Sequence, residues 1–76
     1  MMKKFKVVLT FDNECDSYVA TVPALYEIAS QGKTKEEALK NIQEAITLTI
    51  EGLAEIGQPI PAGDVDVSIA EVVVSA

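Results

Sequence analysis

The chain has 76 residues, of which 49% are hydrophobic and 24% are charged, and its formal net charge is −6. This length allows a single domain over residues 1–76, because a second hydrophobic core could not close in so short a chain. The apolar content excludes a disordered protein. No apolar run reaches the roughly 18 residues of a membrane span, and the first residues lack the apolar segment of a signal peptide. We therefore expect a cytoplasmic protein that does not bind membranes.

The charge is unevenly distributed along the chain. Residues 1–35 contain five Lys and four acidic residues, whereas residues 36–76 contain one Lys and eight acidic residues, and the chain has no Arg. Affinity for nucleic acids depends on Lys and Arg side chains that neutralise phosphates. The sequence therefore argues against direct nucleic-acid binding and favours a basic protein partner.

Three strands are predicted in the first part of the chain. Residues 3–12 alternate between polar and apolar side chains with a period of two, which is typical of a half-buried strand. A polar, turn-forming segment follows, and residues 17–23 predict a second strand that ends at Pro23, because proline cannot donate to a sheet ladder. Residues 25–31 predict a short third strand.

The hydrophobic period changes from two to about 3.6 after Gly32. Thr34 and Glu37 have the spacing of a capping box, in which the hydroxyl accepts from the third helical amide and the carboxylate reaches back. Gly57 followed by Pro59 supplies a stop, so a helix is predicted over residues 35–56. Its apolar face is formed by Ala38, Leu39, Ile42, Ala45, Ile46, Ile50, Leu53 and Ile56.

A last strand is predicted after the helix, over residues 64–75. Its alternation slips at Glu71, which predicts either a bulge or an end that another subunit covers on both faces. A strand that follows a helical crossover normally lies parallel to a neighbour in the sheet, here the first strand. The predicted fold class is therefore α+β, a two-layer β-β-β-α-β sandwich.

One helix covers only one face of such a sheet. The uncovered face is expected to hold Val8 and some of the side chains of Val19, Thr21, Val72 and Val74. An uncovered, partly apolar sheet face predicts self-association, as a dimer or a tetramer.

Residues with catalytic or metal-binding potential are few. The single Cys15 and the absence of His exclude a Cys-His nucleophile pair and a zinc cluster. Asp12, Glu14 and Asp16 begin like a calcium loop, but the positions that require Gly and Glu hold Ser17 and Pro23. A solvated hairpin turn is the favoured interpretation. A glycosidase-like carboxylate pair and a residual metal-dependent nuclease activity are weaker alternatives.

The sequence Gly32-Lys33-Thr34 matches the end of a phosphate-binding loop. That motif also requires a Gly five residues earlier, where this chain has Glu27. Gly32 is therefore expected to permit a bend and Lys33 to be solvated. We expect no cofactor, no metal, no catalytic residue and no enzymatic activity.

The outer face of the predicted helix is acidic. On a helical wheel, Glu37, Glu44, Glu51 and Glu55 lie close together, opposite the apolar stripe, with Leu48 among them. One interpretation is a solvated face that keeps the protein soluble. The other is a docking surface in which Leu48 anchors a basic protein partner.

Several short motifs together resemble the N-terminal domain of HicB-family antitoxins. They are an acidic turn, Tyr-x-Ala-x-x-Pro-x-Leu, (Ser/Thr)-Gln-Gly-x-Thr-x-Glu-Glu-Ala and a late Ile-Pro. The matching residues are Tyr18, Ala20, Pro23, Leu25, Ser30, Gln31, Gly32, Thr34, Glu36, Glu37, Ala38, Ile60 and Pro61. Tyr18, Pro23, Gly32, Thr34 and Glu37 are expected to be structural members of this motif.

The resemblance implies a partial ribonuclease-H-like fold and a role in a type II toxin-antitoxin system. By this resemblance the chain binds and occludes a small basic toxin, HicA, which cleaves RNA. The alternative is an orphan oligomeric or structural domain without a toxin. Two departures are present. Residues 25–29, Leu-Tyr-Glu-Ile-Ala, replace the usual Leu-Pro-Gly-Cys turn, and the chain ends at Ala76 without the DNA-binding domain of many relatives, so we expect a stand-alone domain.

Overall fold

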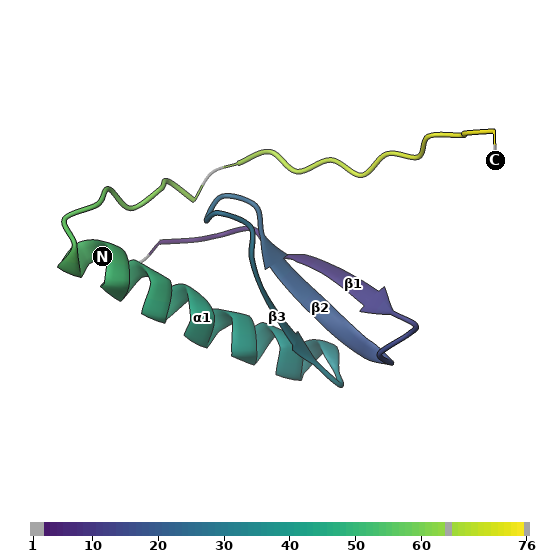
Figure 1. Ribbon diagram of the computed structural model, residues 1–76, viewed down its shortest axis with the longest axis horizontal. Helices are drawn as coiled ribbons and strands as arrows, with labels where there is room; N and C mark the ends of the chain where they lie inside the picture. Colours follow the sequence, from purple (N-terminus) through teal and green to yellow (C-terminus); the bar gives the residue numbers. More distant parts are fainter. Residues whose placement is uncertain (1–2, 64, 76) are drawn as a thin grey trace.

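Three antiparallel strands and one helix form the folded part of the chain. The computed structural model describes residues 3–63 and 65–75. Strands β1 (Val8–Asp12), β2 (Ser17–Val22) and β3 (Ile28–Gly32) lie in the order β1-β2-β3, and α1 (Lys35–Glu55) follows them. The helix lies across one face of the sheet (Figure 1). The predicted α+β class is confirmed for these elements.

The core lies between the helix and the middle of the sheet. Ala20 of β2 stands opposite Leu9 of β1 and opposite Ser30 of β3. Because side chains alternate along a strand, Ala20 and Val22 face the helix, whereas the side chains between them face away. The fully buried residues are Ala20, Val22, Leu25, Ala38 and Ile42, and partly buried ones pack around them, among them Phe5, Val7, Leu9, Tyr18, Ile28, Ala45, Ile46 and Leu53.

The first and third strands are shorter than predicted. β1 begins at Val8 instead of residue 3, because Val8 pairs with Thr21, the partner strand β2 ends one residue later at Val22, and Pro23 has no amide hydrogen to extend the ladder. β3 begins at Ile28 instead of residue 25, because Tyr26 and Glu27 have φ angles of 54° and 53°. These left-handed conformations belong to a turn, not to a strand.

The helix is longer than the sheet that it covers. Its 21 residues span about 31 Å, whereas a strand of six residues, such as β2, spans about 20 Å. Ile56 was predicted to belong to the buried face, but it is 70% exposed because the helix has passed the end of the sheet by that point. Over the residues that the structure describes, the helix lacks the apolar length that crossing a membrane requires.

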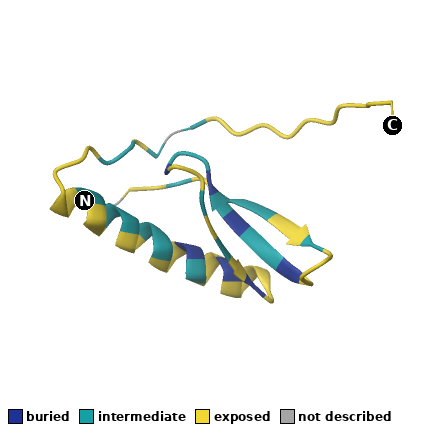
Figure 2. Cartoon of the chain, viewed as in Figure 1, coloured by how far each residue is buried: buried dark blue, intermediate teal, exposed yellow. Residues whose placement is uncertain are grey.

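The predicted fourth strand is not formed. Residues 65–75 are extended but make no ladder with the sheet, and they run away from the domain (Figures 1 and 2). The expected positions of Val72 and Val74 on the uncovered sheet face are therefore wrong for this chain on its own. Val8, Val19 and Thr21 do share that face, because Val8 pairs with Thr21 and both Val19 and Thr21 alternate with buried residues.

Candidate functional site

The helix that carries the candidate site begins at a fixed corner. The Thr34 Oγ1 accepts a hydrogen bond of 3.1 Å from the Glu37 amide, and the Glu37 Oε1 accepts one of 3.1 Å from the Lys33 amide. The first half of the predicted capping box is therefore present, and the Glu37 carboxylate also reaches back, but to the amide of Lys33, one residue before the N-cap Thr34. The Glu37 carboxylate is already bonded to the Lys33 amide in this cap. It is therefore less available to a binding partner than the other acidic residues of the helix.

Three further members of the predicted acidic row lie along the exposed side of α1. Glu44, Glu51 and Glu55 are exposed, and Leu48 between them exposes 68% of its surface. A shallow hollow of about 450 Å³ is lined by Gln43, Glu44, Thr47, Leu48 and Glu51. The structure thus brings Glu44, Leu48 and Glu51 together around one depression, whereas Glu55 lies beyond it at the last helical residue.

The charges of this surface are not balanced within the chain. Among residues 3–63 and 65–75, the Glu44, Glu51 and Glu55 carboxylates take part in no ion pair. The last turn of the helix contains no basic residue, although its free carbonyl groups carry partial negative charge. Glu51 and Glu55 therefore stand where the helix dipole disfavours an anion. A cationic partner would relieve this repulsion, which gives the surface a physical reason to bind one.

The acidic residues of the hairpin turn have a local structural role. Asp12 Oδ1 accepts hydrogen bonds from the amides of Glu14, at 3.0 Å, and Cys15, at 3.4 Å. This is an Asx turn, which stabilises the tight reversal between β1 and β2. Within the described ranges, no three acidic, His or Cys side chains converge as metal ligands would.

The single thiol lies in the same turn and is exposed. A hydrogen bond and the negative charge of Asp12 raise the pKa of Cys15 above its usual value, while Lys33 opposes this shift. A raised pKa keeps the thiol protonated, and the protonated form is a poor nucleophile. This arrangement does not equip Cys15 for catalysis.

The Gly32-Lys33-Thr34 sequence forms the helix corner. Gly32 is buried, and a Cβ atom there would lie 2.5 Å from the Ala38 backbone nitrogen. Lys33 Nζ donates to the Cys15 carbonyl over 3.4 Å and so points toward the hairpin turn. The Thr34 side chain and the Glu37 carboxylate bond the amides that a phosphate would approach, so this corner has the geometry of a cap.

Comparison with known proteins gives the family. A family described as "HicB_like antitoxin of bacterial toxin-antitoxin system" matches residues 5–74. The chain belongs to the HicB-like antitoxin family. The UPF0150 protein Ta0767 of Thermoplasma acidophilum is 48% identical over 58 residues, which cover 76% of this chain and 83% of that protein. The UPF0150 protein ssr1765 of Synechocystis is 39% identical over 71 residues, 92% of this chain and 90% of that protein. No solved structure matches at a significant level.

Three of the residues that carried the resemblance to HicB-like antitoxins, Tyr18, Gly32 and Thr34, lie at the corner between β3 and α1. The Tyr18 ring meets the Phe11 ring edge-on at a centroid distance of 5.0 Å, and Lys35 Nζ lies 5.9 Å from the Tyr18 ring centroid. Pro23 lies at the other end of β2, where it opens the turn after that strand, and Gly32 and Thr34 precede the helix. The Tyr18 contacts join the sheet to the start of α1.

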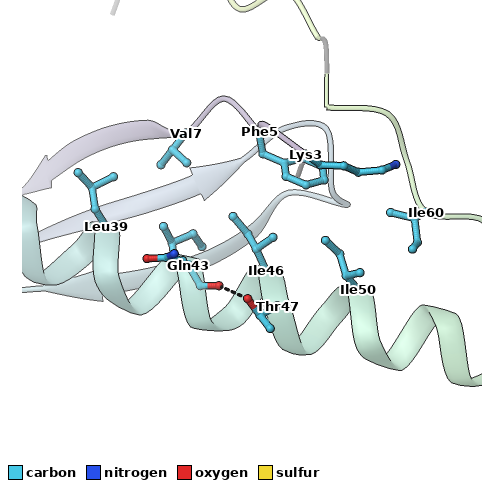
Figure 3. Close-up of a pocket in the computed structure, with 10 residues that line it drawn as sticks. Lys3, Phe5, Val7, Leu39, Gln43, Ile46, Thr47, Ile50 and Ile60 are labelled. Atoms are coloured by element: carbon cyan, nitrogen blue, oxygen red, sulfur yellow. Dashed lines mark hydrogen bonds between the residues drawn. The ribbon is translucent and has the colours of Figure 1, made fainter. Parts of the chain in front are cut away.

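The sequence did not reveal a second hollow of this HicB-like chain, which adjoins the first and shares Gln43 and Thr47 with it. It holds about 530 Å³ and opens between the N-terminal segment and α1 (Figure 3). Phe5 and Val7 line it from the N-terminal segment, Leu39 and Ile46 from the helix, and Ile60 from the segment after the helix. One residue in the sequence hinted at this hollow. Ile60 is apolar although it lies in a turn-rich segment, where an apolar side chain is not required.

Proposed function

We propose that this HicB-like chain is an antitoxin module that binds a small basic RNA-cleaving toxin of the HicA type and occludes its active surface. Family membership implies a toxin-antitoxin role in general, and the acidic helix supports the finer statement. The observation that carries the proposal is the unpaired row of Glu44, Glu51 and Glu55 beside the exposed Leu48.

The proposed mode of binding combines an apolar anchor with electrostatic attraction. Leu48 would enter an apolar depression of the toxin, and the surrounding carboxylates would pair with its Lys and Arg side chains. Such carboxylates would lie at the solvent-exposed rim of the contact, where they speed up association. Their attraction for the toxin's Lys and Arg side chains weakens when salt is added. Inhibition then requires only that the toxin surface is covered, and no chemical step by the antitoxin is needed.

The proposal also covers the location of the complex, its contact with nucleic acid, enzymatic activity and self-association. We place the complex in the cytoplasm, with no direct contact between this chain and nucleic acid, and we assign the chain no enzymatic activity. Self-association as a dimer or a tetramer would place more than one acidic helix in the same assembly. Each toxin would then meet one helix.

The test uses the protein encoded by the reading frame adjacent to that of this chain, which the proposal requires to be small and rich in Lys and Arg. Glu44→Lys combined with Glu51→Lys reverses two charges beside Leu48, and we expect binding measured by calorimetry to weaken by about tenfold or more. The matched control is Glu14→Lys with Glu27→Lys, which makes the same change of charge at exposed positions outside the helix. The control should bind like the unmodified chain. Equal affinity for the helix variant and the unmodified chain would remove the helix face as the docking surface.

A second candidate function is an orphan oligomeric domain that binds only copies of itself. The observation in its favour is the apolar C-terminal segment, in which Ile69 and Val73 expose 92% and 97% of their surfaces. Absence of binding to the adjacent basic protein, together with a stable homo-oligomer, would favour this function over the antitoxin role.

A further inference from the structure

The C-terminal segment exposes more apolar surface than a folded domain normally leaves in water. We call residues 67–75 the tail segment. Ile69, Val72, Val73 and Val74 are 92%, 83%, 97% and 75% exposed. Large contiguous apolar surfaces of this kind mark interaction sites in monomeric proteins. The extended backbone of the tail segment also presents amide and carbonyl groups as a strand does.

The domain offers a matching surface at β1. The sheet order makes β1 an edge strand, and α1 packs on β3 and β2, so β1 is the least covered strand on the helix-facing side of the sheet. The 530 Å³ hollow lies on this side, between the helix and the segment that leads into β1 (Figure 3). Leu39 of α1, which lines the hollow, is 41% exposed, and Phe11, which lies further along β1 outside the hollow, is 45% exposed.

The residues before the tail segment already lie along the start of this edge. Lys3 Nζ donates to the Pro61 carbonyl over 3.5 Å, and Lys6 Nζ lies 3.8 Å from Asp66 Oδ1. A Cβ atom at Gly63 would collide with the Lys4 carbonyl, so the two backbones nearly touch. The two segments therefore run in the same direction, and the chain leaves the domain only after Asp66 (Figure 1).

The chain's own edge is a poor fit for the tail segment beyond this point. Asp66 and Lys6 are on the side of the sheet away from the helix, since Phe5 and Val7 pack into the core. Continued in the same register, the segment would place Val67 and Ile69 on the apolar side, but it would also turn the Glu71 carboxylate toward that side at the level of Phe11. Val72 and Val74 would be turned away from the helix side of the sheet. Burying an unpaired carboxylate against apolar side chains is unfavourable.

We propose that the tail segment of each chain adds to the edge of β1 in a second copy, so that two copies exchange tails. On a second copy the register is free to shift by one residue. Val72 and Val74 then face the helix side of β1 near Phe11, while Val67, Ile69, Glu71 and Val73 face the other side. Exchange about a two-fold axis is reciprocal, so both edges and both tail segments are covered at once. This goes beyond the toxin-binding role and does not depend on it.

The first test measures the mass of the full chain by light scattering. We expect a dimer or a larger even-numbered assembly, and we expect Val72→Lys with Val74→Lys to shift it to the monomer. The control is Ala54→Lys with Gln58→Lys, which adds the same charge at exposed positions outside the tail segment and should leave the assembly intact. A monomeric unmodified chain overturns the proposal, as does an assembly that persists in the tail variant. Circular dichroism shows that α1 is retained in each variant.

The second test distinguishes a second copy from the chain's own tail. In a Cys15→Ser background, one protein carries Thr10→Cys on β1 and the other carries Val73→Cys on the tail segment. A short bis-maleimide reagent should join the two proteins when they are mixed, and it should do so far less when Gln58→Cys replaces Val73→Cys. The proposal is overturned if the mixture gives no more product than this control, or if a chain with both Thr10→Cys and Val73→Cys reacts only within itself.

Discussion

The corner between β3 and α1 and the far end of the chain use apolar residues in different ways. At the corner, Gly32, Ala38 and Ile42 are buried, and the Thr34 cap fixes the direction of the helix. At the far end, Ile56 is 70% exposed and the tail segment is more exposed still. The corner satisfies its own polar and apolar groups, whereas at the far end apolar side chains stay exposed and the carboxylates of Glu51 and Glu55 form no ion pair with residues 3–63 and 65–75.

The difference follows from length as well as composition. The helix is about 10 Å longer than the sheet beneath it, so its last turns have no strand to cover. Leu48 and Ile56 are apolar residues that the core of this chain does not use. A domain of this size has a small core and a marginal free energy of unfolding, so exposed apolar groups that stabilise nothing in the monomer point to binding.

The difference between the two regions should be largest for a pair of leucines, one buried and one exposed. Leu25→Ala should lower the free energy of unfolding by about 3 kcal/mol, because Leu25 is completely buried and its removal leaves a cavity. Leu48→Ala should change it by less than about 0.5 kcal/mol, because that side chain is 68% exposed. Urea unfolding at one fixed protein concentration measures both. Similar losses for the two variants would show that Leu48 supports the fold.

Replacing each of two glycines with alanine should change the free energy of unfolding by a smaller amount, and in opposite directions. Gly32→Ala places a Cβ atom 2.5 Å from the Ala38 backbone nitrogen, so the backbone must move, and we expect a loss of about 2 kcal/mol. Gly52→Ala meets nothing within 4 Å in the exposed last part of the helix, and we expect a gain of up to about 1 kcal/mol. Thermal unfolding of the two variants measures the difference. A loss in both would mean that the end of the helix is packed as tightly as its start.

The sequence predicted best where local rules decide the structure. The cap at Thr34 and the glycine stop placed the helix within one residue of its observed end, and Pro23 correctly ended β2. The start of β3 was wrong because Tyr26 and Glu27 adopt φ angles that side chains of their type rarely take. Nothing in their identity signals such a turn.

Predictions that depend on the surroundings of a segment were less successful. Residues 65–74 have the composition of a strand, but a strand requires a partner, and the chain's own register would bring Glu71 to the apolar side. Ile56 continues the apolar stripe of α1, yet the sheet ends before it. For the site, the periodicity correctly grouped Glu44, Leu48 and Glu51, whereas the hollow beside Phe5 and Val7 needs three segments distant in sequence.

Hydrogen exchange on the full chain, alone and with the adjacent basic protein, tests the toxin-binding role most directly. The last turns of α1 have no sheet beneath them, so their amides should exchange by local opening and respond to a bound partner. We expect the basic protein to slow exchange at residues 43–55, with little change in β2 and β3. The corner at Gly32 and Thr34 should exchange slowly in both states. Protection confined to the strands, with residues 43–55 unchanged, would contradict the assignment of the acidic helix face as the toxin-binding surface.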